Sequence, residues 1–384
     1  MLSTFARAAI MLTVATALFS FEACKGNNSN SAEQTGPAQQ TAPAQQIPSG
    51  KNVLYVSNFN ANTITAYDAE TGALLGTVLK AGSELKGING FEIASDGSFY
   101  VAGQDTNNVV HYSKTGQFIE VLDSANTAGV SAPQGIVFGP DGMLYVASLG
   151  NGKVVRYDTG NRSFKDAFTT VSVRGIAKPQ PIEPRFDSDG NLIVSTFEGG
   201  RILKYQGPRT EALNSTTGGS AARKPAAKPG TLLLTYQLPS KPSAPSTAAT
   251  AVSALNTAYA SGTTFASTAR LASISSAASA PKKRIFIDAV NPKTLVGEIQ
   301  EFLDNGTFVR RFIPNGTGGL VLPGGISMGP DDKLYVANVR VDANFKDIGS
   351  QILRFDPNTG QFLGVFIQGK GLDVPFVMRF KKSQ

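Results

Sequence analysis

A twelve-residue segment occurs twice in nearly the same form, and this internal repeat restricts the fold more than any other feature of the chain. Residues 136–147 read IVFGPDGMLYVA, and residues 326–337 read ISMGPDDKLYVA. Each copy has an apolar run, a turn at an Asp-Gly or Asp-Asp pair and a second apolar run, which predicts a β-hairpin. Weaker copies at 91–102 and 184–195 indicate that one unit is used several times.

Two further apolar runs follow the hairpins and complete a four-stranded unit. The third run is clear at 154–158 and 352–356, and a fourth run at 361–366 comes after a turn. A single four-stranded meander leaves both of its faces uncovered, whereas several packed radially cover one another. The 40 glycines and 21 prolines supply the many turns that such a fold needs. The sequence therefore predicts an all-β fold, a β-propeller of four-stranded antiparallel blades.

An aromatic or aliphatic residue marks the second strand of each unit, and its spacing predicts the number of blades. The markers are separated by 45, 45, 48, 93 and 49 residues: Tyr55, Tyr100, Tyr145, Ile193, Phe286 and Tyr335. The double gap contains the proline-rich stretch 239–245, which opposes a central strand. We therefore expect six blades, with basic low-complexity insertions at about 207–230 and 239–269. A delayed fourth strand at 231–238 and a first strand at 271–275 complete the interrupted blades. Seven blades are the alternative, because the repeat region divides by seven into nearly the same unit length.

The repeat region, residues 51–380, begins and ends in a way that predicts ring closure. The first unit starts at 52–56 with a second strand and has no first strand before it. The segment 375–380 resembles the first strands of the other units. Pairing this C-terminal strand with 52–56 completes the first blade and protects edges that an open sheet would expose.

These repeats resemble those of known propellers. The run 133–138 (PQGIVF), the Asp141-Gly142 turn and the run 144–147 (LYVA) are similar to the NHL-repeat branch of the six-bladed propellers. That branch also includes proteins similar to senescence marker protein, gluconolactonase and virginiamycin B lyase. The run 54–58 (LYVSN) resembles the YVTN type of propeller repeat as well. The resemblance implies a six-bladed β-propeller, a fold that hosts binding modules and enzymes alike.

The resemblance to gluconolactonase implies a metal site that can be compared with the residues. Proteins of this kind hold a divalent cation on the axis with Glu, Asn and Asp ligands, which implies Ca²⁺, Mg²⁺ or Zn²⁺ here. Asn89, directly before a glycine, matches the Asn of that motif, and Glu183 and Asp288 are the candidate carboxylates. The matching positions in two other blades are Gln134 and Gly324, so the set is incomplete. A turn residue is the favoured interpretation of Asn89.

A lyase similar to virginiamycin B lyase needs, as the resemblance implies, a catalytic histidine as general base. The chain has one histidine, His111, and it alternates with apolar residues inside a predicted third strand. A structural role in the strand is the favoured interpretation, and lyase activity is not expected. The single cysteine and single histidine also exclude intramolecular disulfides, Cys-based zinc sites and His-rich metal clusters.

The N-terminus has the features of a targeting segment. Arg7 is the only charge before an apolar run at 8–21, which is short for a membrane span. Cys24 follows Phe-Glu-Ala, an arrangement that resembles the lipobox of bacterial lipoproteins, whose cysteine becomes lipidated. We expect a signal peptide at 1–23 and a flexible tether at 24–50. The protein is then extracytoplasmic and held at a membrane by the lipid on Cys24; plain secretion or an uncleaved anchor is the alternative.

The net charge of +7 comes from one region rather than from the predicted ring. Residues 207–284 contain nine Lys and Arg but one Glu, a net +8, so the remaining residues sum to −1. Few aromatic residues accompany these charges, and stacking on single-stranded nucleic acid needs them. No nucleic-acid partner is predicted.

The blade repeats are complete and the catalytic set is not, which favours a non-catalytic, monomeric scaffold that binds a protein or a small molecule. A metal-dependent, gluconolactonase-like hydrolase is the alternative. The binding surface is expected in the funnel formed by loops that precede first strands and follow second strands. The polar candidates in these loops are Asn58, Asn89, Gln104, Gln134, Glu183, Glu198 and Asn338.

Overall fold

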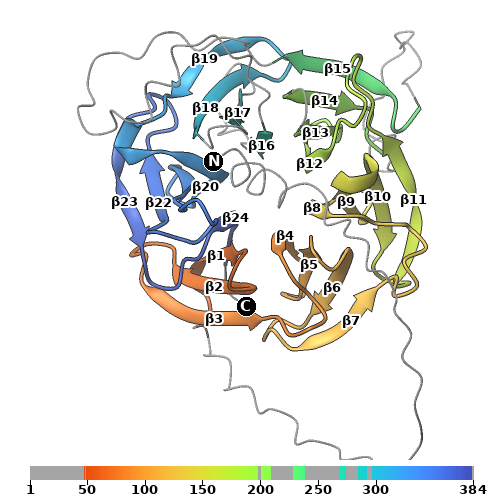
Figure 1. The fold of residues 1–384 in the computed structure, drawn as a ribbon, viewed down its shortest axis with the longest axis horizontal. Coiled ribbons are helices and arrows are strands. Elements are labelled where there is room, and N and C mark those ends of the chain that lie inside the picture. Colours follow the sequence, from red (N-terminus) through yellow and green to blue (C-terminus); the bar gives the residue numbers. More distant parts are fainter. Residues whose placement is uncertain are drawn as a thin grey trace, which may run out of the picture.

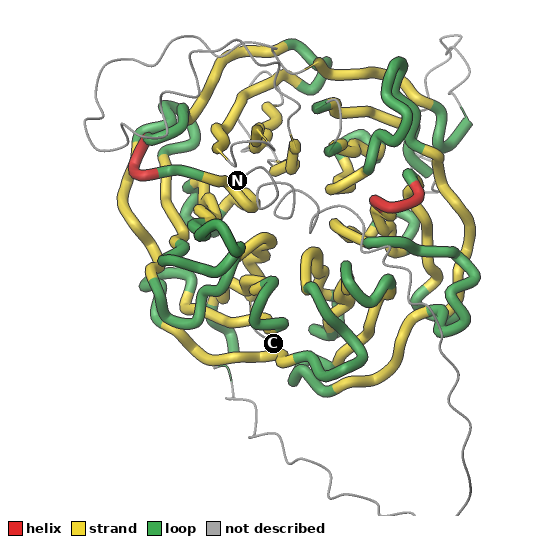
Figure 2. The backbone as a smooth tube through the Cα atoms, viewed as in Figure 1, coloured by secondary structure: helices red, strands yellow, loops and turns green. Residues whose placement is uncertain are grey.

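Six four-stranded antiparallel sheets stand around a common axis as the blades of a propeller (Figure 1). The computed structural model describes residues 47, 49–197, 200–208, 228–237, 268–273, 284–291 and 296–382. Within these ranges Figure 2 shows helix only at two short 3-10 turns, Leu149–Asn151 and Thr317–Gly319. No helix in the described part of the chain is long and apolar enough to span a membrane.

We number the blades in chain order and give the strands of each blade from the axis outward. Blade 1 consists of β24 (Pro375–Lys382), β1 (Asn52–Asn58), β2 (Thr63–Asp68) and β3 (Leu74–Lys80). Blade 2 consists of β4 (Ile88–Ile93), β5 (Phe99–Gly103), β6 (Asn108–Tyr112) and β7 (Phe118–Leu122). Blade 3 consists of β8 (Pro133–Phe138), β9 (Leu144–Ser148), β10 (Lys153–Asp158) and β11 (Ser163–Thr170). Blade 4 consists of β12 (Pro181–Phe186), β13 (Leu192–Thr196), β14 (Arg201–Tyr205) and β15 (Leu232–Gln237). Blade 5 consists of β16 (Thr268–Ser273), β17 (Arg284–Asn291), β18 (Val296–Leu303) and β19 (Phe308–Ile313). Blade 6 consists of β20 (Leu322–Met328), β21 (Leu334–Val339), β22 (Gln351–Phe355) and β23 (Phe362–Gln368). In Figure 1 the fourth strands run along the circumference.

The prediction of six blades is confirmed, and so is closure of the ring by the C-terminal strand. β24 pairs with β1 from Asn52, opposite Lys382, to Asn58, opposite Pro375. β24 also contacts β20 on one side and β4 on the other, so the sixth and second blades meet the first and the seven-bladed alternative is wrong.

The strands beside the double gap lie close to their predicted positions. β15 falls inside the predicted range 231–238, whereas β16 begins at Thr268, three residues before the predicted first strand. The signal peptide, the tether and most of both insertions lie outside the described residues and stay predictions.

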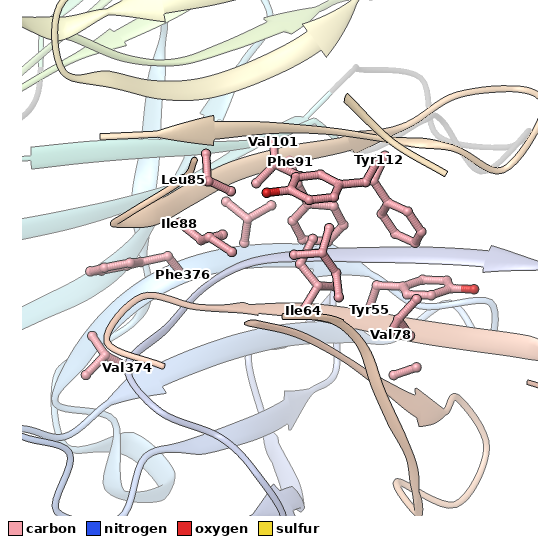
Figure 3. Packing of buried hydrophobic residues seen from close by; sticks show 14 of the residues in the cluster. Tyr55, Ile64, Val78, Leu85, Ile88, Phe91, Val101, Tyr112, Val374 and Phe376 are labelled. Atoms are coloured by element: carbon pink, nitrogen blue, oxygen red, sulfur yellow. The ribbon is translucent and has the colours of Figure 1, made fainter. Parts of the chain in front are cut away.

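The hydrophobic core is divided into six clusters, one between each pair of neighbouring blades. Between blades 1 and 2, Tyr55 and Ile64 pack against Phe91 and Tyr112 (Figure 3). Strands place successive side chains on opposite faces, and both faces carry apolar residues here, so each blade is covered by two neighbours. Burying one such large side chain stabilises the fold by about 1.5–3 kcal/mol. The ring therefore gains its stability from contacts between blades.

The first strands approach one another closely around the axis. In five of the six blades, the pairing between the first and second strands shifts its register near the funnel end, which marks a β-bulge. A bulge bends the strand and redirects its side chains. Glycine stands at this point in three blades. A Cβ on Gly90 would lie 2.3 Å from the carbonyl oxygen of Gln134, and one on Gly325 would lie 2.0 Å from that of Phe376. Only glycine therefore fits where these first strands meet.

Candidate functional site

The loops that precede first strands and follow second strands gather at one end of the ring, which we call the funnel face. Asn58, at the end of β1, pairs with Pro375, at the start of β24, so both lie at this end. The side chains at the bulges of β4, β8 and β12 include three of the predicted candidates: Asn89, Gln134 and Glu183. The bulges therefore set the direction in which these side chains point.

Three predicted candidates form an amide cluster between blades 2 and 3. Asn89 Nδ2 donates hydrogen bonds to Gln104 Oε1 at 3.0 Å and to Gln134 Oε1 at 2.6 Å. Gln134 Nε2 donates to the same Gln104 oxygen at 2.6 Å. All three residues are buried, and buried amides need hydrogen-bond partners. The cluster holds the funnel ends of the two blades together.

Asn58 and Asn338 bind loops of their own blades. Asn58 Oδ1 accepts a hydrogen bond from the N–H of Asp373 at 3.0 Å. Asn338 Oδ1 accepts one from the N–H of Val321 at 2.8 Å, and Asn338 Nδ2 donates to the carbonyl oxygen of Gly319 at 3.0 Å. Each Asn thus connects the end of a second strand to the loop that leads into the first strand of the same blade.

Glu183 belongs to a network of ion pairs that joins opposite blades. Its carboxylate pairs with Arg185 of the same strand and, at 3.6 Å, with Arg379 of β24. Arg379 also pairs with Glu92 of β4 at 3.2 Å. Blades 1 and 4 face each other in a six-bladed ring, so the pair between Arg379 and Glu183 bridges the axis. We call these four residues the axial network.

A small hollow lies beside the axial network, lined by residues of β12, β20 and β24. Its empty volume, open solvent included, is about 220 Å³. Glu183 Oε2 is buried there and has no hydrogen-bond partner among the described residues. A Cβ on Gly135 would lie 2.1 Å from this oxygen, so glycine at this position leaves room for the carboxylate.

Lys381 extends the row of charges along β24, away from the funnel face. Its ammonium donates a hydrogen bond to the carbonyl oxygen of Ala94. Burial lowers the pKa of Lys381, and the nearby carboxylates of Glu92 and Asp96 offset part of this shift. Charges of both signs therefore line the axis.

The three candidate metal ligands have different surroundings. Asn89 belongs to the amide cluster, Glu183 belongs to the axial network, and Asp288 is fully buried on β17 opposite Arg270 of β16. Within the described ranges, no group of three or more His, Cys, Asp and Glu side chains is arranged to hold a metal ion. Two guanidinium groups already neutralise Glu183, so these residues do not fit a divalent cation in the observed arrangement. The metal site stays a prediction.

His111 lies on the third strand of blade 2, two strands out from the axis. Its ring stacks on Tyr100 with centroids 4.3 Å apart, and its Nδ1 lies 3.4 Å from Glu120 Oε1. In blade 3 the same register position is Arg156, which lies opposite Tyr145 and 5.7 Å from its ring. His111 therefore occupies the register position that holds an arginine in blade 3. This position within a strand fits the structural role that is expected from the sequence.

Sequence reasoning missed Glu92, Arg185 and Arg379, three of the four residues of the axial network. A signal was present: Glu92, Arg185 and Arg379 share one register position, opposite the second-strand marker of their blades. A comparison of this position across the blades identifies three charged first-strand residues. Glu198, the remaining candidate, lies outside the described residues.

Strained backbone is concentrated at the funnel face. Ala132, Gln180 and Val374 each precede the proline that starts a first strand, and their φ angles are 45°, 47° and 53°. Positive φ is uncommon outside glycine and is an outlier for a β-branched residue such as Val374. It costs about 1–3 kcal/mol at each position and is concentrated in proteins at functional sites. The strain favours this face as the one that carries the function.

Comparisons with known proteins agree with this architecture. No protein-family model and no curated protein matches the chain. A Bacteroides caccae protein of unknown function is 13% identical over 87% of this chain and 100% of its own, with a TM-score of 0.56. A chain from a nidogen/laminin complex is 11% identical, with 86% and 98% covered and a TM-score of 0.52. The periplasmic gluconolactonase of Pseudomonas aeruginosa is 14% identical, with 87% and 99% covered and a TM-score of 0.48. The six four-stranded sheets and the likeness to the first two of these structures agree on the fold that the repeats predict, a six-bladed β-propeller.

Proposed function

We propose that this protein is a non-catalytic scaffold of the cell envelope, a monomeric propeller whose funnel face binds a protein or a small molecule. The axial network carries the proposal. Glu183 is the candidate metal-binding carboxylate on the first strand of blade 4, and it pairs with Arg185 and Arg379. A divalent cation at Glu183 would lie near two guanidinium groups. Its repulsion from each, at roughly 5 Å and an effective dielectric constant of about 20, is on the order of several kcal/mol.

The alternative is a metal-dependent hydrolase of lactones. One observation favours it: Glu183 Oε2 is buried beside a hollow and accepts no hydrogen bond from the described residues. The fold does not decide between the two functions, because the similar solved structures include both a gluconolactonase and a chain from a nidogen/laminin complex.

A hydrolysis assay on the full chain distinguishes them. The purified protein and Glu183→Gln are incubated with a panel of sugar and aliphatic lactones, with EDTA or with Ca²⁺, Mg²⁺ or Zn²⁺. We expect both proteins to match the uncatalysed rate under every condition. Cation-dependent turnover in the unmodified protein that is lost in Glu183→Gln would establish the hydrolase and overturn the scaffold.

The proposed location rests on Cys24, which lies outside the described residues. A lipid on this cysteine holds the protein at a membrane, and the following segment separates the ring from the lipid surface. Cys24→Ala is expected to move the protein from the membrane fraction to the soluble fraction. Unchanged membrane association of this variant would contradict the lipid anchor and indicate an uncleaved N-terminal segment.

A further inference from the structure

Exposed apolar side chains are concentrated on the fourth strands, toward the ends of these strands that lie away from the funnel face. Ten large hydrophobic residues are exposed in the described part of the chain, and nine of them lie on fourth strands. They occupy the first residue of β3, the first two residues of β7, β15 and β19, and two residues of β23. Those of β3, β7 and β19 are Leu74, Phe118, Ile119, Phe308 and Val309. We call this band, to which five of the six blades contribute, the apolar rim.

The position of the fourth strands explains why these side chains are accessible but not why they are apolar. A fourth strand is the outermost strand of its blade, so neighbouring blades cover it least. At the funnel face the same strands end differently. Three of them end in exposed polar residues and two in buried apolar ones: Lys80, Thr170 and Gln368, and Leu122 and Ile313. Single exposed apolar residues need no explanation, whereas a repeated band at one end of the ring indicates an interaction surface.

The shape of the apolar rim indicates what covers it. The fourth strands run along the circumference, as Figure 1 shows, so the rim follows the edge of one end of the ring. Side chains at equivalent positions of a ring lie close to one plane. A compact protein partner reaches part of such a band, whereas a flat lipid surface meets all five blades at once.

The chain enters the ring at this same end. Asn52, the first residue of β1, lies opposite Lys382, and Val53 lies opposite Asp68, beside the turn that leads to Leu74. The predicted tether, 24–50, therefore joins the ring at the apolar rim. A flexible chain of this length spans about 30 Å on average, so a lipid on its first residue keeps this end near the membrane. Such confinement raises the effective concentration of the lipid surface, and a modest apolar area then suffices for contact.

We propose that the apolar rim rests on the lipid membrane and directs the funnel face away from it. Phe118, Ile119 and Phe308 enter the boundary between headgroups and acyl chains, as the apolar faces of interfacial segments do. The exposed turns at this end carry charges of both signs, among them Lys114 and Asp96, so the contact depends on apolar area rather than on charge. The proposal rests on the lipid anchor proposed above, and it does not depend on what the funnel face binds.

Single tryptophans report which end of the ring touches lipid, because the chain has no tryptophan of its own. Phe118→Trp and Phe308→Trp probe the apolar rim. The matched control is Ile348→Trp, because Ile348 is 59% exposed and lies between β21 and β22, in a loop at the funnel face. Each lipidated full chain is reconstituted into phosphatidylcholine vesicles with and without brominated acyl chains.

Bromine quenches tryptophan only at close range. We expect brominated lipid to reduce the fluorescence at least about twofold at positions 118 and 308, and by less than about a tenth at position 348. Absence of quenching at either rim position, or equal quenching at position 348, would overturn the proposal.

Removing apolar surface tests the contact itself. Ile119→Glu and Val309→Glu, combined in the Phe118→Trp protein, are expected to abolish the quenching, whereas Ile348→Glu leaves it unchanged. Ile119 and Val309 are 43% and 44% exposed, so the ring is expected to stay folded, which circular dichroism checks. Quenching is expected to be equal in about 0.05 M and about 0.5 M salt, because salt screens charges and not apolar contacts.

Quenching that persists in the double Glu variant, or that is lost in salt, would overturn the apolar contact. Vesicle-bound protein without quenching at the rim would contradict this proposal alone. Protein that does not stay with the vesicles would contradict the lipid anchor as well.

Discussion

Replacing Arg379 by methionine removes the cation that joins three blades and keeps most of the length of the side chain. The guanidinium group pairs with Glu92 at 3.2 Å and with Glu183 at 3.6 Å, and it lies 5.9 Å from the ring of Phe91. The side chains of Arg379 and Glu92 are 15% and 18% exposed, and that of Glu183 is 3% exposed. The pairs are therefore neither fully buried nor freely solvated.

The expected cost lies between two limits. Exposed ion pairs contribute about 0–1 kcal/mol, and breaking a buried pair costs about 3–5 kcal/mol. Glu183 keeps Arg185 as a partner after the substitution, which reduces the penalty. We therefore expect Arg379→Met to lower the free energy of unfolding by about 2–3 kcal/mol.

Urea denaturation followed by circular dichroism measures this loss, and Arg162→Met is the matched control. Arg162 pairs with Glu120 at 3.4 Å, but its side chain is 67% exposed, so its replacement is expected to cost at most about 0.5 kcal/mol. The cost at Arg379 is expected to persist in about 0.5 M salt, because partly buried pairs are screened less. Equal costs for the two variants would refute the reasoning that the axial network stabilises the closed ring.

Two further predictions concern the packing around the axis and a turn at the rim. Gly135→Ala is expected to destabilise the protein by more than about 2 kcal/mol, because its Cβ would lie 2.1 Å from Glu183 Oε2. The control is Gly160→Ala, whose Cβ would meet only a flexible carboxylate at 3.3 Å. It is expected to change the free energy of unfolding by no more than about 0.5 kcal/mol. Equal effects of the two substitutions in thermal unfolding would contradict the close approach of Gly135 and Glu183. Hydrogen bonds, first that from the N–H of Thr71, lower the pKa of Asp68 to about 2. Because its pKa is lower in the folded protein, ionised Asp68 stabilises the fold at pH values above the pKa in the unfolded chain, about 3.9. This stabilisation is lost as the pH falls toward 2 and the carboxylate becomes protonated. The stability difference from Asp68→Asn is therefore expected to shrink between pH 6 and pH 2, and a difference independent of pH in urea titrations would argue against this role.

The fold could be predicted because its information is local and repeated. The hairpins at 136–147 and 326–337 each encode two strands and a turn, and their spacing determines the blade length. Closure could be predicted for the same reason, because 375–380 carries the pattern of a first strand. The start of β16 was harder to locate, since no apolar alternation marks Thr268.

The site could be predicted only in part, because its contacts join residues that are far apart in the sequence. The loop position identified Asn89 and Gln134, but their hydrogen bond depends on the distance between two blades. The pair between Glu183 and Arg379 depends on ring closure and on the width of the axis. The eleven residues that join β21 to β22 do not belong to the repeat, so the repeat does not predict their structure.

Calorimetric titration of a divalent cation tests most directly the central claim that an ion-pair network occupies the axis. Ca²⁺, Mg²⁺ and Zn²⁺ are each titrated into the EDTA-treated full chain and into Glu183→Gln. We predict no binding that depends on Glu183, because Arg185 and Arg379 neutralise its carboxylate. Binding of one cation per chain that disappears in Glu183→Gln would contradict the claim and identify the axis as a metal site.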